Sequence, residues 1–389
     1  MEIFPNLIIF LELFSIFKLL LFICDIMNDL KFNKLINLKL SQESGQTSQP
    51  PWRHSSVENT DKFEQLIYLK KPSFINKLTS QNTSLNRLPV LLKLSQDKSN
   101  LNEFIYTYEF AKKLNKSTFL MDNLEFSFEN FSDREISIIE DGIRDELIKI
   151  YDLDFDLEKF YDFLLSDERL ADSVDFCNGL RLFMANDPFE CIISSICSAN
   201  NSIARWTKSI DKIKSNWGNK FEFDSGVFYD FPDKSSFLNF YETPIEEAEA
   251  DGHRFEMECY TKNLKACGVG YRAPYMIKAS NILLDEMDMD EIYTMDYYEA
   301  FDLVLDLPGV GPKVADCILL YGFGFKEAFP SDVWIKRIVS HLYFGGEDIS
   351  ADKTREFGIG HFGDYAGYAQ LYLFHYARKS GLMEKIKNK

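Results

Sequence analysis

A lysine and an aspartate stand in this chain where they could act together on a sugar. Lys313 comes directly after the turn Gly309-Val310-Gly311-Pro312, and Asp332 follows Pro330 and Ser331 further along. A lysine amine can attack an electrophilic carbon, and a nearby carboxylate can stabilise the positive charge that develops there. We therefore expect nucleophilic chemistry at a sugar C1′, with Lys313 as the nucleophile and Asp332 as its electrostatic partner.

A helical hairpin must position this lysine. Apolar residues recur at near-helical spacing over 292–305 and again over 314–320, which predicts a helix on each side of the turn. Gly309, Val310 and Gly311 leave backbone N–H groups uncovered, an arrangement that suits a phosphate backbone. Alone this is a weak signal, because glycine also ends helices for structural reasons. A dinucleotide site is disfavoured, since no strand precedes the turn and no third glycine follows at the required spacing.

Asp332 also has a purely structural interpretation. The stretch 333–339 reads as a helix, and an aspartate before it would accept backbone N–H bonds as an N-cap. The capping role and the catalytic role are compatible, because a carboxylate has two oxygens.

The hairpin is one of several segments that resemble the helix-hairpin-helix DNA glycosylases, in particular their 8-oxoguanine DNA glycosylase/lyase branch. The similarity is strong over about half of the chain, from roughly residue 154 to residue 378. The matching segments occur in order along the chain: 187–191, 198–205, 268–273, the hairpin, 330–333 and 365–370. The resemblance implies a bifunctional enzyme of base excision repair that excises 8-oxoguanine opposite cytosine through a lysine Schiff base, followed by β-elimination of the 3′ phosphate. Its partner would be double-stranded DNA containing oxidised guanine.

By the same resemblance, four residues would hold the flipped base. Cys317 and Phe374 would sandwich the purine, Gln370 would read its Watson–Crick edge, and the Gly45 carbonyl would accept the hydrogen that oxidation places on N7. Gln370 and Phe374 lie four apart on one predicted helix, so they share a face. Cys317 and Phe374 also fall on apolar faces and could be plain core. Gly45 lies in the Ser-, Gln- and Pro-rich stretch 39–61, which we predict to be a loop.

Four further residues would face the opposite strand. Asn200, Arg205 and Arg272 would bond the orphaned cytosine, since amides and guanidinium groups read base edges, and Tyr271 would wedge into the stack. One departure from the family concerns Trp334, which stands where the family often has a histidine. It leaves open the details of phosphate contact and pocket closure.

The composition describes a folded protein that carries too much negative charge for simple DNA binding. The 389 residues include 46% hydrophobic and 15% aromatic residues, and the net charge is −18. Phosphate binding relies on Lys and Arg, so we expect a local basic face on an acidic body. Acidic stretches lie at 246–251 and 284–291. The basic residues of the matched segments would form that face: Arg205, Lys208, Arg272, Lys278, Lys313, Lys336 and Arg337.

Cysteine and histidine spacing predicts no metal site and no cofactor. The seven cysteines are scattered without paired short spacings, which is typical of a reducing compartment, and the five histidines show no ligand spacing. Related endonuclease III proteins hold an iron–sulfur cluster with cysteines after the catalytic region, but no cysteine follows Cys317 here. We therefore expect no cluster, an intracellular enzyme (cytoplasm or nucleoid, or nucleus if eukaryotic) and a monomer.

The order of patterns predicts an α+β protein, with a small β-rich N-terminal domain before a larger all-helical domain. Short apolar and aromatic runs over 63–128 indicate strands, the Ser/Asn/Gln-rich stretch 79–100 reads as turns, and helical patterns run from 135 to the C-terminus. We place the domains at 29–152 and 153–389.

Residues 1–28 are an apolar lead or a misassigned start. Glu2, Glu12 and Lys18 interrupt the lead, and no positive region opens it, so we expect no membrane anchor, although an amphipathic or anchoring helix remains the alternative.

Two other functions stay open at this point. A glycosylase for another damaged purine would keep the hairpin and Asp332 without needing Lys313, Gln370 or Asn200. A non-catalytic DNA-binding protein would need only the hairpin, and the pairing of Lys313 with Asp332 speaks against it.

Overall fold

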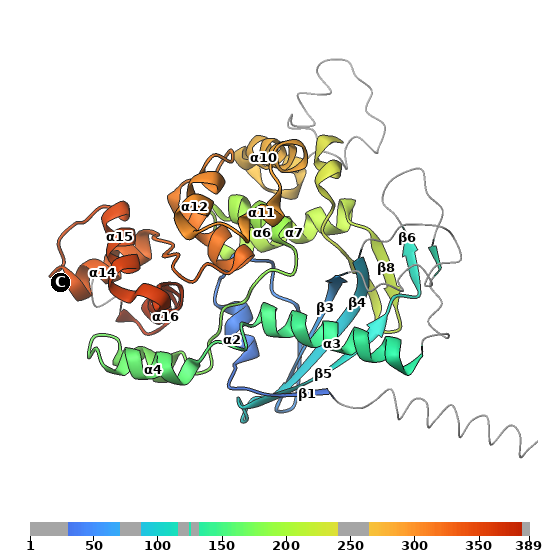
Figure 1. The fold of residues 1–389 in the computed structure, drawn as a ribbon, viewed down its shortest axis with the longest axis horizontal. Coiled ribbons are helices and arrows are strands. Elements are labelled where there is room, and N and C mark those ends of the chain that lie inside the picture. The colour runs from blue at the N-terminus through green and yellow to red at the C-terminus, as the bar shows by residue number, and fades with distance from the viewer. Residues whose placement is uncertain (1–29, 71–86, 116–123, 126–131, 240–263, 383–389) are drawn as a thin grey trace, which may run out of the picture.

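The structure is a computed structural model that describes residues 30–70, 87–115, 124–125, 132–239 and 264–382. The apolar lead and the acidic stretch 246–251 lie outside the described residues. Strands dominate the first part of the chain and helices the rest, which confirms the α+β class (Figure 1).

The N-terminal part is built on a five-stranded antiparallel sheet with the order β1-β5-β4-β3-β2. Central β4 is buried on both faces: Val90 and Leu92 join one hydrophobic core, and Leu91 joins another. Residues 79–86 of the stretch predicted to be turn-rich lie outside the described residues, and over 87–97 the prediction is wrong, because this run pairs with β3 and β5. The strands are β1 Leu30–Asn33, β2 Arg53–Val57, β3 Thr60–Lys70, β4 Arg87–Asp97 and β5 Glu103–Phe110.

Helix α3 (Asp133–Ile150) covers one face of this sheet (Figure 1). It begins with a capping box between Ser132 and Glu135, which satisfies two of the free N–H groups at the helix start. Ile139, Ile143 and Leu147 recur at helical spacing and pack on the sheet. Leu153 and Phe183 belong to the same core. The domain boundary between 152 and 153 stays a prediction.

A second sheet of four strands, in the order β7-β6-β8-β9, joins distant parts of the chain. Its strands β8 and β9 come after two long helices, so the second part of the chain is not all-helical as predicted. Phe221 and Phe228 of these strands pack against Leu66 and Leu91 of the first sheet, where apolar alternation becomes buried. The strands are β6 Lys113–Asn115, β7 Leu124–Glu125, β8 Lys220–Phe223 and β9 Gly226–Tyr229.

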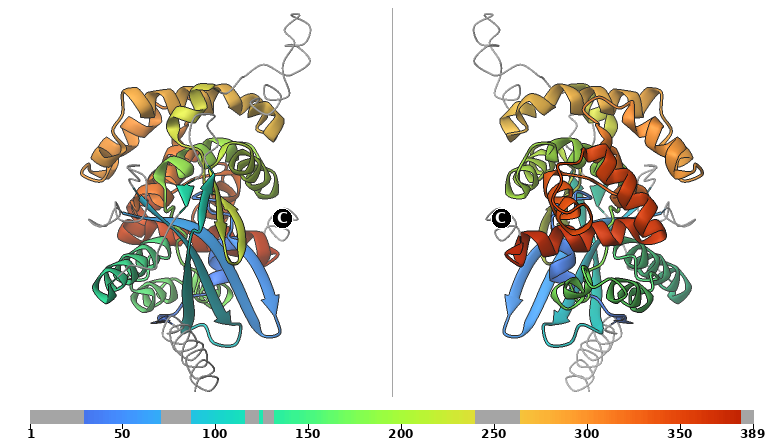
Figure 2. Two further views of the ribbon diagram at one scale, coloured as in Figure 1. Left: turned by 90° about the vertical axis from the view of Figure 1, so that its right-hand side faces the viewer. Right: turned by 90° about the vertical axis from the view of Figure 1, so that its left-hand side faces the viewer.

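The remaining described chain is helical and shares one large core. Figure 2 shows these helices packed around the strands of the first part of the chain. The helical stretch predicted for 292–305 is broken near Met295, because Asp296 caps a new helix there. The α-helices are α4 Leu157–Leu165, α5 Ala171–Phe176, α6 Pro188–Ser198, α7 Ile203–Trp217, α10 Ala273–Asp285, α11 Met289–Ile292, α12 Tyr297–Leu305, α13 Pro312–Ile318, α14 Val333–Tyr343, α15 Ala351–Phe362 and α16 Ala366–Lys379.

Single turns and a π-helix connect these helices. The π-helix η5 continues α13 directly, so the helix changes its winding just after the predicted base-binding cysteine. The 3-10 helices are η2 Lys234–Asn239, η3 Leu264–Cys267, η4 Gly270–Arg272 and η6 Gly363–Tyr365, and the π-helix η5 is Leu319–Phe323. None of the helices in the described part of the chain is long and apolar enough to cross a bilayer.

The stretch 39–61 is only partly the loop that we predicted. It contains helix α2 (Leu38–Glu43), strand β2 and the start of β3. Between α2 and β2 the chain is irregular but buried: Ser44, Gln46, Thr47, Ser48 and Gln49 are each at most 5% exposed. A buried irregular segment must satisfy its polar groups inside the protein, and this requirement shapes the site described next.

Candidate active site

Six of the predicted residues line one cavity. Its volume of about 40 Å³ has room for a few water molecules and not for a purine. The residues come from the irregular N-terminal segment and from helices α13, α14 and α16: Gly45, Lys313, Cys317, Asp332, Gln370 and Phe374. The cavity must therefore widen before any base could enter.

Buried hydrogen bonds fix the N-terminal wall of the cavity. The Gln46 amide donates to the carbonyls of Ser41 and Arg181, at 3.0 Å each, and its oxygen accepts from the Phe183 N–H at 2.8 Å. These bonds hold the backbone on one side of Gly45, whose φ of +95° favours glycine. A Cβ at this position would lie 2.5 Å from Ile203 Cδ1, so a larger residue would have to displace the end of that side chain as well as adopt this strained conformation.

The hairpin has the predicted form and places Lys313 in the first turn of α13. The N–H of Val310 donates to the Leu307 carbonyl at 3.0 Å, which closes the turn between α12 and α13. Gly309 has a φ of +83°, and a Cβ there would lie 2.7 Å from Cβ of Tyr275. The side where a Cβ of Gly311 would stand is open, with nothing within 4 Å. The hairpin thus packs on α10 through one glycine and faces outward at the other.

Lys313, which is half-buried, and the buried Cys317 lie one helical turn apart on α13. Burial alone lowers the pKa of Lys313, but the side chains of Cys317 and Asp332 outweigh it and hold that pKa above its usual value. Burial raises the pKa of the Cys317 thiol, against the opposing influence of Lys313 and the Thr47 hydroxyl. The lysine is therefore protonated in the DNA-free protein, and it must lose a proton before it can act as a nucleophile.

Asp332 caps α14, as its sequence position predicted. One oxygen, Oδ1, accepts from the N–H groups of Trp334 and Ile335, at 2.9 Å each. The second oxygen takes no part in these capping bonds, and the residue lines the cavity. Trp334, which stands where the family often has a histidine, is partly buried against the helical core.

The amide of Gln370 offers an acceptor inside the cavity. Its nitrogen donates to the Pro330 carbonyl at 3.1 Å, whereas its buried oxygen finds no partner among the described residues. A buried acceptor without a partner costs free energy in the empty protein, and a ligand that donates to it would recover that cost. Phe374 lies one turn further on α16, with the Arg378 guanidinium 4.9 Å from its ring.

The residues predicted to face the opposite strand form a second group around α10. Asn200 has a φ of +50°, and its amide approaches the Tyr271 hydroxyl at 3.4 Å. Tyr271 is 56% exposed, as a wedge would have to be. Arg205 is exposed on α7. These positions suit base contacts from outside the cavity.

Arg272 does not have the expected placement. Its guanidinium is buried and donates to the carbonyls of Ala199, Asn200 and Val269, at 2.6, 3.0 and 3.1 Å. The side chain therefore holds the Asn200 loop in place instead of pointing to a base. Such a role depends on loop geometry, which the sequence does not reveal.

The predicted basic face is smaller than expected. Arg272 is buried, Lys313 lines the cavity, and Lys336 forms an ion pair with Asp348 at 2.7 Å. Arg205, Lys208, Lys278 and Arg337 remain exposed.

Two sets of polar residues near the site were missed by sequence reasoning. Asp316 lies on α13 with no exposed surface and accepts from Tyr297 at 2.5 Å and from Arg355 at 2.9 Å, which joins α13 to α12 and α15. Thr47 lines the cavity, and its hydroxyl lies 2.9 Å from that of Ser195. A buried charge within an apolar helix was a usable signal for Asp316. The contact of Thr47 joins residues distant in sequence, so no signal was available.

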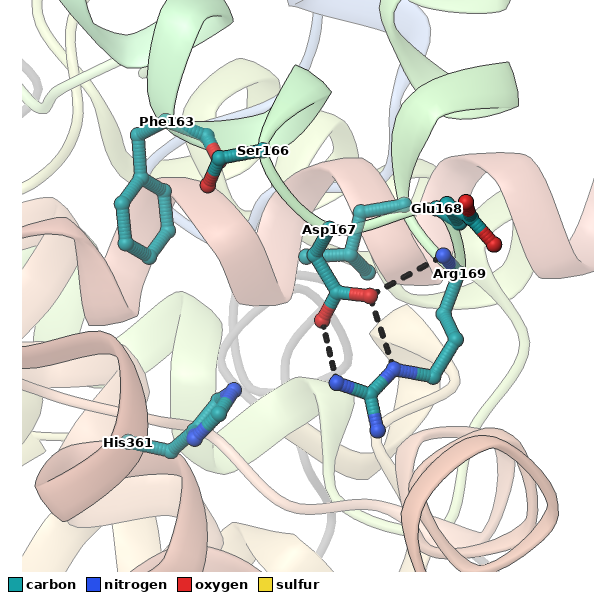
Figure 3. Close-up of a pocket in the computed structure, with 7 residues that line it drawn as sticks. Phe163, Ser166, Asp167, Glu168, Arg169 and His361 are labelled. Atoms are coloured by element: carbon teal, nitrogen blue, oxygen red, sulfur yellow. Dashed lines mark hydrogen bonds and ion pairs between the residues drawn. The ribbon is translucent and has the colours of Figure 1, made fainter.

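A larger cavity lies away from this site, between the turn after α4 and helix α15, with a volume of about 490 Å³. Figure 3 shows Asp167 bound to Arg169 on one side of it and His361 on the other. Asp167 also accepts from the Tyr343 hydroxyl at 2.9 Å. The charges of Asp167 and Arg169 thus satisfy each other. Among the described residues, no cluster of His, Cys, Asp and Glu is arranged to hold a metal.

Comparison with known proteins places the chain in a family. Residues 29–192 match the N-terminal domain of 8-oxoguanine DNA glycosylases, and residues 193–358 match the helix-hairpin-helix superfamily of base excision DNA repair proteins. A probable N-glycosylase/DNA lyase of Methanothermobacter thermautotrophicus is 38% identical over 90% of this chain and 96% of its own length. The chain belongs to the 8-oxoguanine DNA glycosylase family.

Further relatives of this glycosylase-family chain agree with that assignment. An N-glycosylase/DNA lyase of Saccharomyces cerevisiae is 31% identical over 55% of this chain and 54% of its own length. An 8-oxoguanine glycosylase/lyase of Clostridium acetobutylicum, solved with double-stranded DNA containing cytosine opposite 8-oxoguanine, superimposes with a TM-score of 0.62. That match covers 90% of this chain and 93% of the other, at 25% identity.

Proposed function

We propose that this protein is a bifunctional DNA glycosylase and AP lyase that excises 8-oxoguanine opposite cytosine. The observation that carries the proposal is the convergence of Lys313, Asp332 and Gln370 with Gly45 around one cavity. The family membership and the DNA complex of the clostridial relative support the substrate. The enzyme would work as a monomer inside the cell, where its substrate DNA is.

Binding would begin at the two outward-facing parts of the site. The Gly311 side of the hairpin is open to a phosphate, while Asn200, Arg205 and Tyr271 would contact the partner strand and fill the gap left by the flipped base. Arg272 would act by holding the Asn200 loop. Because the cavity is too small for a purine in the DNA-free protein, its walls must move apart to admit the base between Phe374 and Cys317.

Recognition inside the cavity would combine a hydrogen bond to the Watson–Crick edge, which guanine also offers, with one at N7 that guanine itself cannot match. Gln370 Oε1, without a partner in the described protein, would accept from the Watson–Crick edge. The Gly45 carbonyl would accept the N7 hydrogen that only the oxidised base carries. The Gln370 oxygen would cost little binding energy in desolvation, since it is already buried without a partner among the described residues.

The chemical step would run through Lys313. After it loses a proton, its Nζ forms a bond to C1′ while the bond from C1′ to the base breaks, and the base leaves with the electron pair and takes up a proton. Asp332 would stabilise the positive charge on the sugar. Opening of the sugar ring gives a Schiff base, and loss of a hydrogen from C2′ then expels the 3′ phosphate. One lysine would thus serve both activities.

Borohydride trapping tests this proposal directly. The purified protein would be incubated with duplexes that carry 8-oxoguanine opposite each of the four bases. We expect a covalent adduct, strongest opposite cytosine. The Lys313→Gln variant should lose the adduct and at least about 10³-fold in strand cleavage, with DNA affinity nearly unchanged. Lys159→Gln, a matched change of an exposed lysine on α4, should behave like the wild type.

The other outcomes identify the rival functions. Release of free base without an adduct would show a monofunctional glycosylase, and the lesion released would name its substrate. Binding of DNA with neither release nor adduct would leave only a DNA-binding protein. Either result would contradict the proposal.

A further inference from the structure

Tyr271, the residue proposed to wedge into the base stack, is exposed and yet held in place. Its side chain is 56% exposed. The Arg272 guanidinium lies 4.4 Å from the centre of its ring, and the Asn200 amide donates to its hydroxyl at 3.4 Å. The ring of Tyr275, four residues further along, meets it edge to face, with centroids 6.5 Å apart and planes at 86°. The wedge therefore has a defined orientation in the DNA-free protein.

Tyr275 also lies against the hairpin. A Cβ at Gly309 would stand 2.7 Å from Cβ of Tyr275 and 3.0 Å from its Cγ. The hairpin backbone can approach this side chain so closely only because residue 309 is a glycine. The base of the Tyr275 side chain thus packs on the hairpin, while its ring meets Tyr271. One side chain connects two parts of the surface that would face DNA.

The carbon atoms of Tyr275 make these contacts, and its hydroxyl takes no part in them. Within the described ranges that hydroxyl has no hydrogen-bond partner, and the side chain is 42% exposed. A role in packing therefore requires the aromatic ring alone, whereas direct contact with a DNA phosphate would require the hydroxyl. The two roles respond differently to replacement by phenylalanine.

We propose that Tyr275 is a positioning residue that couples the wedge Tyr271 to the hairpin at Gly309. The hairpin fixes the phosphate backbone, and the wedge must enter the stack at the step from which the base leaves. A side chain packed between them sets their separation before DNA binds, so less ordering is required on binding. The proposal rests on the proposed function, because it takes Tyr271 to be the wedge.

The first test is a double-mutant cycle on single-turnover excision of 8-oxoguanine opposite cytosine. Tyr275→Ala should slow excision about 10-fold in the wild-type background and less than about 2-fold in the Tyr271→Ala background, because Tyr275 acts through Tyr271. Effects of the two substitutions that multiply independently would overturn the proposal.

Further variants separate the ring of Tyr275 from its hydroxyl and its bulk. Tyr275→Phe keeps the ring and should match the wild type, and a loss as large as that of Tyr275→Ala would indicate a hydroxyl contact with DNA and contradict the coupling. Tyr275→Leu keeps apolar bulk against Gly309 without a ring and should be slow, so it replaces the alanine variant if that variant does not fold. Tyr298→Ala is the matched control and should leave excision unchanged, because Tyr298 is an exposed tyrosine on α12 whose ring meets that of Tyr297 at 5.2 Å.

The second test replaces the damaged nucleotide by an abasic site. Such a duplex has no base to unstack, so Tyr275→Ala should cleave it within about 2-fold of the wild-type rate although it excises 8-oxoguanine slowly. An equal loss on both substrates would show that Tyr275 supports the hairpin or the lysine helix in general, and the coupling would be wrong.

Base flipping can also be followed without the chemical step. A 2-aminopurine placed beside 8-oxoguanine fluoresces more strongly when its neighbour leaves the stack, and in the Lys313→Gln background Tyr275→Ala should slow this rise about 10-fold. If the wild type excises nothing, the proposed function fails and the fluorescence alone decides the coupling. If excision occurs but the fluorescence rises equally fast with and without Tyr275→Ala, the function stands and the coupling is wrong.

Discussion

The cavity at the hairpin and the cavity between α4 and α15 are opposites in size and in chemistry. The first has a volume of about 40 Å³ and the second about 490 Å³. In the small cavity, Gln370 keeps an acceptor without a partner in the described protein. In the large one, Asp167 binds both Arg169 and Tyr343, so its charge is already satisfied.

The polar groups left without partners, and not the volume, distinguish a candidate reactive site from an ordinary surface cavity. The volume of a cavity shows only where packing is loose. A reaction requires polar groups that are held in place and are still able to bind a substrate, because no protein group already uses their charge or hydrogen-bonding capacity. The small cavity includes a half-buried lysine, a carboxylate with an oxygen outside its capping bonds and an amide oxygen without a partner among the described residues. We therefore expect changes in the small cavity to alter turnover and changes of buried charges elsewhere to alter stability.

The strongest test of this comparison is to neutralise one carboxylate in each cavity. Asp332→Asn keeps a good N-cap but loses the charge, so single-turnover excision should fall about 10²- to 10³-fold with little change in melting temperature. Asp167→Asn should leave excision unchanged and cost about 0.5–1 kcal/mol of stability, as expected for a partly exposed ion pair. Excision assays and urea unfolding would be run on both. Equal loss of activity in the two variants would break the comparison.

A buried carboxylate outside the hairpin cavity should instead appear in the pH dependence of stability. Burial raises the pKa of Asp230 from 3.8 to about 6. A carboxyl with a higher pKa in the folded state binds protons more readily when folded, so the unfolding free energy falls as pH rises from about 4 to 6 and is then level. Relative to the wild type, Asp230→Asn should gain up to about 3 kcal/mol between pH 4 and pH 7.

Urea unfolding over that pH range measures the effect for Asp230. Asp230 and Asp233 both line a further cavity, apart from the two compared above. Asp233→Asn is the matched control, because Asp233 is exposed. If the unfolding free energies of wild type and Asp230→Asn changed in parallel with pH, the charge of Asp230 would not destabilise the fold. That result would contradict the expectation that buried charges outside the hairpin cavity act on stability.

The smallest effects are expected when each of two buried glutamines, Gln370 and Gln42, is replaced by methionine. Gln370→Met loses one hydrogen bond but removes an unsatisfied oxygen, so stability should change by less than about 1 kcal/mol while kcat/KM for 8-oxoguanine falls about 10-fold. Gln42 makes bonds with both ends of its amide, to Tyr151 and Trp52. Gln42→Met should cost about 2 kcal/mol of stability and leave base discrimination unchanged. Thermal melts and excision assays with guanine and 8-oxoguanine duplexes distinguish the two patterns.

The parts of the site predicted from sequence are those set by local rules. The hairpin of Gly309 and Gly311, the Asp332 cap and the shared face of Gln370 and Phe374 each depend on neighbours within one or two helical turns. Propensity, capping and helical spacing act over this distance, so a sequence pattern carries them. The resemblance to a known family then supplied the roles that spacing alone left open.

The errors occurred where distant segments meet. The strands β8 and β9 interrupt a helical region because β8 pairs with β6, far earlier in the chain, and β9 pairs with β8. The predicted loop near Ser44 is buried because Arg181 and Phe183 satisfy Gln46. Arg272, expected at a base, is held by three carbonyls of folded loops.

By itself the sequence determined the α+β class, the hairpin with Lys313, the capping Asp332 and the family to which the chain belongs. Only the tertiary structure decided that Thr47 meets Ser195, that Arg272 supports a loop, and that Asp167 in the larger cavity is paired with Arg169. The physical reason is the range of the forces involved. Backbone conformation depends mainly on residues close together in the sequence, whereas burial and hydrogen-bond partners are set only after separate segments have packed together.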